Sequence, residues 1–512
     1  MTPRHRQLIA GDGSGDADAR TGRNLWSWVL GYSLVILLTG CALGPDYKRP
    51  AITSPDSFRG VAPSLNTNSV ANLAWWDIYK DPTLNQLIRI ALENNFDIRI
   101  AATRIEQARQ QAAQTRAEFY PQVGYQGAFG TGKNQMIGSS TPAGGKDVST
   151  ALLALNAMWE VDLWGRVRRL NEAARAQFLA SEEARNGVTL SLVAAVAQSY
   201  FELLELDMEL EIARRSTLSF GESYNLFNRR LEGGTVSKLD TSRAEAAMAT
   251  AAASIPNIER QIVLKENELN LLLGHRPGPV LRLAKLLGQT MPPEVPAGLP
   301  CDLLKRRPDI RQNEQNLRAA NARIGVAMTE FLPKIGLTAL AGQLSPDLGH
   351  IAMDAGSAGT WSVAANATGP IFQGGKLVAQ YREAKAAWDE ARLTYEKTVL
   401  NALAEVANAL IARQKLEGVR IQQVRAVRAY QESFSTSTKR YMAGKASYLD
   451  VLDSQQSLFP AENALAQTRL SQLLAVVQLY KALGGGWQHE LDRRGPPASQ
   501  ETETKVKTTP VK

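Results

Sequence analysis

The chain contains Arg230-Leu-Glu-Gly-Gly-Thr-Val-Ser-Lys-Leu-Asp240 and, 210 residues later, Arg440-Tyr-Met-Ala-Gly-Lys-Ala-Ser-Tyr-Leu-Asp450. Each copy has a glycine, Gly234 or Gly444, of the kind that suits the left-handed position just past a helix C-terminus. Each copy then has a serine followed three residues later by an aspartate, which is the capping-box pattern of a new helix. The two stretches therefore predict the tips of two helical hairpins, with Asp240 and Asp450 as caps.

The segments that lead into the two tips predict unusually long helices. Residues 166–230 contain no proline, and about 65 helical residues extend about 98 Å. Residues 374–440 predict a second helix of similar length, with apolar residues spaced three and four apart. Shorter helices are expected at 83–119, at 237–273 with a kink at Pro256, and at 447–483.

The rest of the chain is duplicated as well. Glu118-Phe-Tyr-Pro121 matches Glu330-Phe-Leu-Pro333, and Asp97-Ile-Arg99 matches Asp309-Ile-Arg311, both 212 residues apart. We expect a first repeat at 83–273, with strands at about 121–130 and 151–164, and a second repeat at 308–483, with strands at about 333–343 and 360–372. A Gly/Pro-rich connector at 274–307 joins the repeats, and a polar tail at 484–512 is expected to be disordered.

The predicted strands alternate between apolar and polar residues, as Val123 and Tyr125 do with Gln122 and Gln126. Four strands cannot close a barrel, an open sheet edge is not tolerated in lipid, and membrane barrels begin at about eight strands. We therefore expect an α+β membrane protein in which three copies form a 12-stranded β-barrel, four strands per chain, continued by a long α-helical barrel. The alternative is a soluble sheet of two hairpins packed on helices. Trp159, Trp164 and Trp361 are candidates for interfacial aromatic residues.

The N-terminus carries a predicted signal peptide, residues 1–40. An apolar run at 25–38 follows two arginines, is too short to span a membrane comfortably, and leads into Leu38-Thr-Gly-Cys41. This tetrapeptide is typical of a bacterial lipobox, whose cysteine is acylated after cleavage. Residues 41–82 are then expected to form a lipid-anchored extended segment. The alternative interpretation is an ordinary buried helix with an incidental cysteine.

Composition excludes several classes of protein. The chain has 512 residues, a net charge of +8 and a mean hydropathy of −0.22, which does not fit a polytopic helical membrane protein. Its four histidines are scattered, and no basic patch contains interleaved aromatics, so neither a metal site nor nucleic-acid binding is expected. No phosphate loop or nucleophile elbow is present, so no catalytic residue or cofactor is expected. Glu160 and Asp162 are interpreted as lining a pore.

Several segments resemble one family. They are the residues from Cys41 to Pro50, Trp75-Trp76 with Asp81-Pro82, Arg306-Arg-Pro-Asp-Ile-Arg311, the second tip, and the residues from Tyr480 to Trp487. Over about residues 41–488 the chain resembles the TolC-like outer-membrane factors, in particular the lipoprotein branch of resistance-nodulation-division efflux systems (OprM/NodT type). The resemblance implies a homotrimer in the outer membrane, a helical periplasmic tunnel, and docking to a periplasmic adaptor and an inner-membrane transporter of that class.

The resemblance also implies functional positions. Adaptor docking would fall on the tips, at Arg230, Gly234, Ser237, Asp240, Arg440, Gly444, Ser447 and Asp450. The positions that close the periplasmic end hold Phe434 and Ala446, and an alanine departs from the acidic residue common in the family. The favoured function is a passive exit duct for small toxic compounds or drugs. The alternatives are an exit duct for type I protein secretion, a lipid-anchored coiled-coil tether and an enzyme.

Overall fold

The computed structural model describes residues 42–51, 75–133, 147–291, 303–345 and 359–485. These form two compact units, one made of residues within 1–48, 110–176 and 318–389, and one made of residues within 49–109, 177–317 and 390–512. The predicted signal peptide, Cys41 and the tail beyond residue 485 lie outside the described residues.

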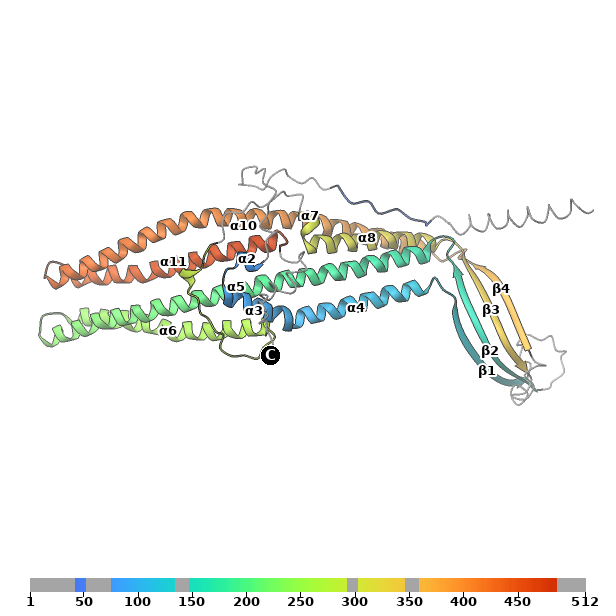
Figure 1. Ribbon diagram of the computed structural model, residues 1–512, viewed down its shortest axis with the longest axis horizontal. Helices are drawn as coiled ribbons and strands as arrows, with labels where there is room; N and C mark the ends of the chain where they lie inside the picture. Colours follow the sequence, from blue (N-terminus) through green and yellow to red (C-terminus); the bar gives the residue numbers. More distant parts are fainter. Residues whose placement is uncertain (1–41, 52–74, 134–146, 292–302, 346–358, 486–512) are drawn as a thin grey trace, which may run out of the picture. The chain divides into compact units, whose positions relative to one another are not determined.

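The first unit contains an antiparallel sheet of four strands in the order β1-β2-β3-β4 (Figure 1). The strands are β1 (Gln122–Lys133), β2 (Asp147–Val161), β3 (Lys334–Ser345) and β4 (Gly359–Thr368). β2 begins four residues before the strand expected at 151–164 and ends at Val161, before Asp162. β4 ends at Thr368, four residues earlier than expected, because Gly369-Pro370 follows and a proline has no N–H for a strand ladder.

The described helices are α2 (Trp75–Ile78), α3 (Pro82–Asn94), α4 (Phe96–Ala117), α5 (Arg166–Glu232), α6 (Lys238–Leu272), the 3₁₀ turn η2 (Leu286–Gly288), α7 (Leu303–Arg306), α8 (Pro308–Thr329), α10 (Lys376–Met442) and α11 (Tyr448–Ala482). The long helices α5 and α10 have 67 residues each, or about 100 Å at ~1.5 Å per residue. α6 is continuous through Pro256, and α11 is continuous through Pro460.

The prediction of a single helix at 83–119 is wrong, because the helix is interrupted at Asn95. The Asn95 carboxamide oxygen accepts from the backbone N–H groups of Asp97 (2.8 Å) and Ile98 (3.2 Å), so it caps a new helix, α4. Its amide nitrogen donates to the carbonyl of Leu272 (2.9 Å), at the end of α6. The break thus ties the start of α4 to the end of α6.

The internal duplication is confirmed in the lengths of the elements. Four pairs of elements have equal numbers of residues: 22 in α4 and α8, 12 in β1 and β3, 67 in α5 and α10, and 35 in α6 and α11. The paired strands β2 and β4 differ, with 15 and 10 residues. Glycines with positive φ recur 210 residues apart, as Gly234 and Gly444 do at the two tips. The offset changes from 212 at β1 and β3 to 210 at α5 and α10, so the two-residue difference lies in the strand hairpins.

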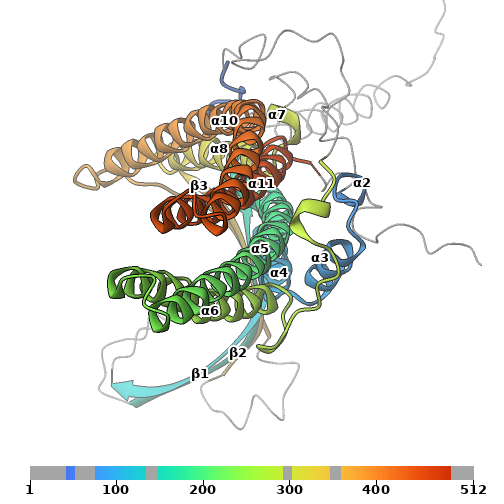
Figure 2. The same ribbon diagram turned by 90° about the vertical axis from the view of Figure 1, so that its left-hand side faces the viewer.

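In the second unit, α6 lies beside α5 and α11 lies beside α10, and each pair forms a hairpin (Figure 2). The hairpins share an apolar core made of residues from α5, α6 and α11: Ile212, Phe220, Phe227, Ala244, Ala247, Tyr448, Val451, Leu452 and Phe459. Among the described helices, α5 contains a window of 18 residues apolar enough to cross a membrane, but 61% of that window is buried. That burial is typical of a core helix.

Candidate functional site

The strand sheet exposes large apolar side chains on one of its faces. Tyr125, Leu155 and Val363 belong to this face and are 84%, 60% and 73% exposed. The pairing Tyr125↔Leu155↔Ala341↔Trp361 shows that their neighbours across the strands share the same face. A sheet face this apolar requires either a protein partner or lipid to cover it.

The opposite face is more polar and has a repeated detail. Gly124 lies opposite Asn156, and Gly336 lies opposite Asn366. A Cβ atom on Gly336 would come within 2.4 Å of the Asn366 side-chain oxygen, so the asparagine fills the space that the glycine leaves. The predicted alternation of the strands is therefore present, and the polar face can contact water.

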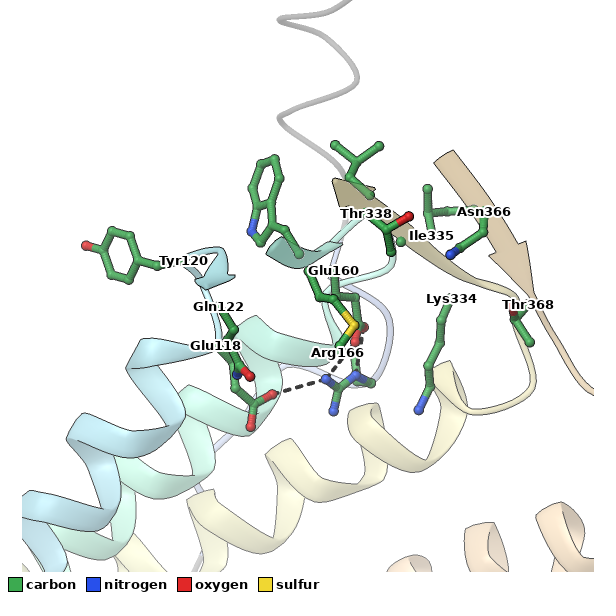
Figure 3. Close-up of a pocket in the computed structure, with 14 residues that line it drawn as sticks. Glu118, Tyr120, Gln122, Glu160, Arg166, Lys334, Ile335, Thr338, Asn366 and Thr368 are labelled. Carbon is green, nitrogen blue, oxygen red and sulfur yellow. Dashed lines mark hydrogen bonds and ion pairs between the residues drawn. The ribbon is translucent and has the colours of Figure 1, made fainter. Parts of the chain in front are cut away.

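The junction between β2 and α5 forms one wall of a cavity of about 360 Å³ (Figure 3). Arg166, the first residue of α5, donates to both oxygens of Glu160 (2.8 and 2.9 Å) and to Glu118 (3.1 Å). Lys334, Asn366 and Thr368 line the same cavity from β3 and β4. The charges near Arg166 are thus paired inside the chain.

Glu160 and Asp162, which the sequence suggested as pore-lining carboxylates, both have partners within the chain. Glu160 holds Arg166, and Asp162 lies beyond the end of β2. The Asp162 carboxylate accepts from the backbone N–H groups of Val167 (3.1 Å) and Arg168 (2.9 Å), so it neutralises unpaired donors at the start of α5. Both carboxylates are committed to the junction.

The segment that follows Cys41 is held against α5 and α8. The Leu43 N–H donates to the Trp164 carbonyl (3.0 Å), and Arg169 donates to the carbonyls of Leu43 (3.0 Å) and Gly44 (3.2 Å). A Cβ atom on Gly44 would lie 2.5 Å from the Gly325 backbone, so only glycine fits this approach. Residues 42–46 therefore have a built binding surface on their own chain.

Both tips have the predicted capping boxes. The Asp240 N–H donates to Ser237 Oγ and the Ser237 N–H donates to Asp240, and Ser447 and Asp450 repeat this exchange. Gly234 and Gly444 have φ of 71° and 67°, as the helix ends require. These bonds account for both aspartates as caps.

The tips differ in their aromatic residues. Tyr441 and Tyr448, in the second tip, pack on Phe227 of α5, with ring centroids 5.6 and 3.8 Å away. Arg230 Nη1 donates to the Tyr441 hydroxyl (2.6 Å), and its guanidinium carbon lies 4.7 Å from the centre of the Tyr441 ring. Arg440 is exposed instead. The arginines at equivalent positions therefore have different surroundings.

The two positions suggested for closing the duct also lie at this end of the helices. Phe434 is partly buried and packs against the apolar core of the tips. Ala446 lies between the positive-φ Gly444 and the cap Ser447, and it is partly buried. In this conformation the Phe434 side chain contacts its own chain.

Two further polar anchors were not identified as such from the sequence. Arg307 is 7% exposed and donates to Asp309 two residues away, to Glu405 (2.7 Å) and to the Ala482 carbonyl (2.9 Å). Asp81 caps α3 and accepts from Tyr200 (2.8 Å) and Gln289 (2.7 Å). Its Asp-Pro sequence at a helix start was the only local signal.

The sequence matches the model of the outer membrane efflux protein family over residues 87–275 and 299–485. The chain belongs to this family. Its relatives include the toluene efflux pump outer membrane protein TtgC of Pseudomonas putida, 39% identical over 91% of this chain and 97% of that protein. They also include the cation efflux system protein CusC of Escherichia coli, 33% identical over 90% of this chain and 99% of that protein.

Solved structures agree with the family. The outer-membrane channel OprN superposes with a TM-score of 0.80 at 31% identity, over 88% of this chain and all of that one. The open state of the MtrE outer membrane channel of Neisseria gonorrhoeae superposes with a TM-score of 0.77 at 32% identity, over 87% of this chain and 99% of that one. This efflux protein is therefore located in the outer membrane.

Proposed function

We propose that three copies of this outer membrane efflux protein form the passive exit duct of a tripartite pump for small toxic compounds or drugs. The observation that carries the proposal is the sheet of four strands, with an exposed apolar face, a more polar face and two edges that pair with no other described strand. Twelve such strands close a barrel that leaves no edge in lipid and turns its polar face to water. The duct has no catalytic role, and the energy comes from the partner pump.

The proposed substrates are organic molecules that the polar face lets pass without tight binding. Relatives are named for toluene, solvent, antibiotic and cation efflux. A duct of this kind selects by its width and by the charges on its lining. On the polar face, Asn156, Thr338 and Asn366 are uncharged, Arg166 is paired with Glu118 and Glu160, and Lys334 is paired with Glu330. This lining fits uncharged and weakly charged solutes.

We further propose that Cys41 carries the lipid anchor. Support comes from the segment just after it, because Ala42 lies against Gly165 and Leu43 bonds to Trp164 at the end of the strand sheet. An acyl chain on Cys41 would then leave the protein next to the part that enters lipid. In a Cys41→Ser variant we expect loss of palmitate labelling and weaker membrane retention of a folded protein. Unchanged labelling would disprove the anchor.

The tips are the proposed docking surface for a periplasmic adaptor, which connects the duct to an inner-membrane transporter. Gly234, Ser237, Arg440, Gly444, Ser447 and Asp450 are exposed there, and Arg230 and Asp240 are partly buried. Phe434 and Ala446, near the same end, are the proposed gate. Opening requires Phe434 to change its packing on the apolar core, so we expect Phe434→Ala to increase the fraction of time that the channel conducts.

The direct test is single-channel recording in planar bilayers, with the mass of the detergent-solubilised protein measured in parallel. We expect the mass of a trimer and discrete openings of low conductance. A monomer that produces no channels would contradict the proposed function. Phe434→Ala should give more frequent openings at the same trimer mass.

A further inference from the structure

We propose that β4 of each subunit pairs antiparallel with β1 of a partner subunit in one defined register, with Thr368 opposite Gln126 of the partner subunit. This inference rests on the proposed trimer and specifies how its barrel closes. It follows from the duplication of the chain together with the strand pairings inside one chain.

The two outer strands need a partner outside the chain. β1 and β4 each pair with only one of the described strands, so each has a free edge. Just beyond β4, Ile371 and Phe372 are 104% and 88% exposed, which leaves both side chains without cover from their own chain. Placing unpaired backbone N–H and C=O groups in lipid is energetically unfavourable. A head-to-tail contact of β4 with β1 closes a ring, whereas a contact of two β1 strands would leave β4 open.

The duplication predicts strand registers correctly where the chain allows a check. In the first hairpin, Gln122 lies opposite Met158. Adding the repeat offsets, 212 for β1 to β3 and 210 for β2 to β4, predicts that Lys334 lies opposite Thr368. That pair is present in the second hairpin. The two hairpins therefore have equivalent registers.

Applied to the β2–β3 pairing, the same offsets predict the register of the contact between subunits. β2 corresponds to β4, and β3 corresponds to β1 of the next copy. Met158 lies opposite Thr338 inside the chain, which places Thr368 opposite Gln126 of the partner subunit. In the same way, Leu155↔Ala341 becomes Ala365 opposite Phe129 of the partner subunit.

The side chains fit this register. Thr368 and Gln126 of the partner subunit are both polar and belong to the polar faces of their strands. Ala365 and Phe129 of the partner subunit are both apolar and exposed in the single chain. A slip by one residue would place polar side chains on the lipid face. A slip by two residues keeps the faces, and the duplication excludes it.

Disulfide trapping tests the register. Directly opposed residues in antiparallel strands have Cα atoms ~4.5–5.5 Å apart, within the ~4.4–6.8 Å of a disulfide, whereas a pair displaced by two residues is ~7–8 Å apart. In a Cys301→Ser background, Thr368→Cys with Gln126→Cys should give cross-linked dimers and trimers on non-reducing gels. Thr368→Cys with Ala128→Cys is the displaced pair and should cross-link several-fold less.

Met158→Cys with Thr338→Cys is the matched control inside one chain, and its thiols should disappear without a change in oligomeric mass. The native mass of every variant is measured before oxidation. A trimer that cross-links better through Ala128→Cys, or that cross-links through neither pair, overturns the register and leaves the duct intact. Absence of a trimer from the unmodified protein would instead overturn the proposed function, and the register with it.

Discussion

The junctions that follow β2 and β4 are equivalent in the duplication, but their chemistry differs. After β2, Asp162 caps α5 and Arg166 binds Glu118 and Glu160. After β4, the residues that correspond to Glu160 and Asp162 are Pro370 and Phe372, and Phe372 is almost fully exposed. At the first junction, the helix cap and the partners of Arg166 all belong to the same chain. The second lacks this cap and these ion pairs, which agrees with the proposed pairing of β4 with a partner subunit.

The ends of the shorter helices show the same divergence. Asn95 binds the carbonyl of Leu272 at the end of α6, and its equivalent Arg307 binds the carbonyl of Ala482 at the end of α11. An uncharged amide makes this connection in the first repeat, and a buried cation with two carboxylates makes it in the second. The position is thus retained with different interactions. We therefore expect mutation of Arg307 and of Asn95 to lower the free energy of unfolding by different amounts.

The largest effect is expected at Arg307. Removing one member of a buried ion pair lowers the free energy of unfolding by ~3–5 kcal/mol. Because Asp309 and Glu405 are about half exposed, we expect a smaller loss of about 2–3 kcal/mol for Arg307→Ala. Asn95→Ala should lower the free energy of unfolding by about 1 kcal/mol, the usual value for a helix cap. Chemical unfolding in detergent, followed by circular dichroism, measures both. An equal or larger loss at Asn95 would contradict the comparison.

The two strand-to-helix junctions should respond to mutation in different ways. Asp162→Ala removes a helix cap and should lower the free energy of unfolding by about 1 kcal/mol. Phe372→Ala removes a side chain that packs little on its own chain, so unfolding of the single chain should change little. The trimer should dissociate at a lower detergent concentration instead. If Phe372→Ala weakens the chain and leaves the trimer unchanged, the second junction is completed inside the chain after all.

A smaller, pH-dependent effect distinguishes the long helices. Burial, and then the hydrogen bond with Glu209, raise the pKa of Glu205 from 4.5 to about 8. The folded state therefore keeps a proton that the unfolded state releases, so the free energy of unfolding falls as pH rises from about 4.5 to about 8.

The variant Glu205→Gln removes this ionisation. It should unfold at a higher temperature than the parent at pH 8, and the difference should shrink towards pH 5. The equivalent residue in α10 is the exposed Lys415, so Lys415→Gln is the matched control and should show no such dependence. If Glu205→Gln raises the unfolding temperature equally at both pH values, the Glu205 side chain destabilises the protein for a reason other than its ionisation.

The smallest effect is expected at the tips. Arg230→Ala removes the contact with Tyr441 and should lower stability by about 0.5–1 kcal/mol, as for an exposed cation–π pair. Arg440→Ala removes an exposed side chain, and its effect should lie within experimental error. Thermal unfolding of the two variants beside the parent measures the difference. Equal losses would mean that the aromatic residues of the second tip do not distinguish the two arginines.

The features that sequence reasoning found were those with local signals. Gly234 and Gly444 follow helices, and the serine–aspartate pairs fix the starts of α6 and α11 within the tips. The early end of β4 also has a local signal, Gly369-Pro370, although the period-2 alternation of the preceding residues favours a longer strand. Asn95 and Arg307 could not be placed from sequence, because their partners Leu272 and Ala482 lie about 175 residues away. Burial of a polar side chain depends on such distant neighbours.

The central claim is that the polar face of the strands lines a conducting pore. Thr338 and Leu337 are adjacent in β3 and lie on opposite faces. In a Cys301→Ser background, single-channel recording of Thr338→Cys and Leu337→Cys tests the claim with a charged, membrane-impermeant thiol reagent. The account predicts that the reagent reduces the current through Thr338→Cys channels and leaves Leu337→Cys channels unchanged. Reduction of the current through Leu337→Cys alone, or equal reduction in both, would contradict it.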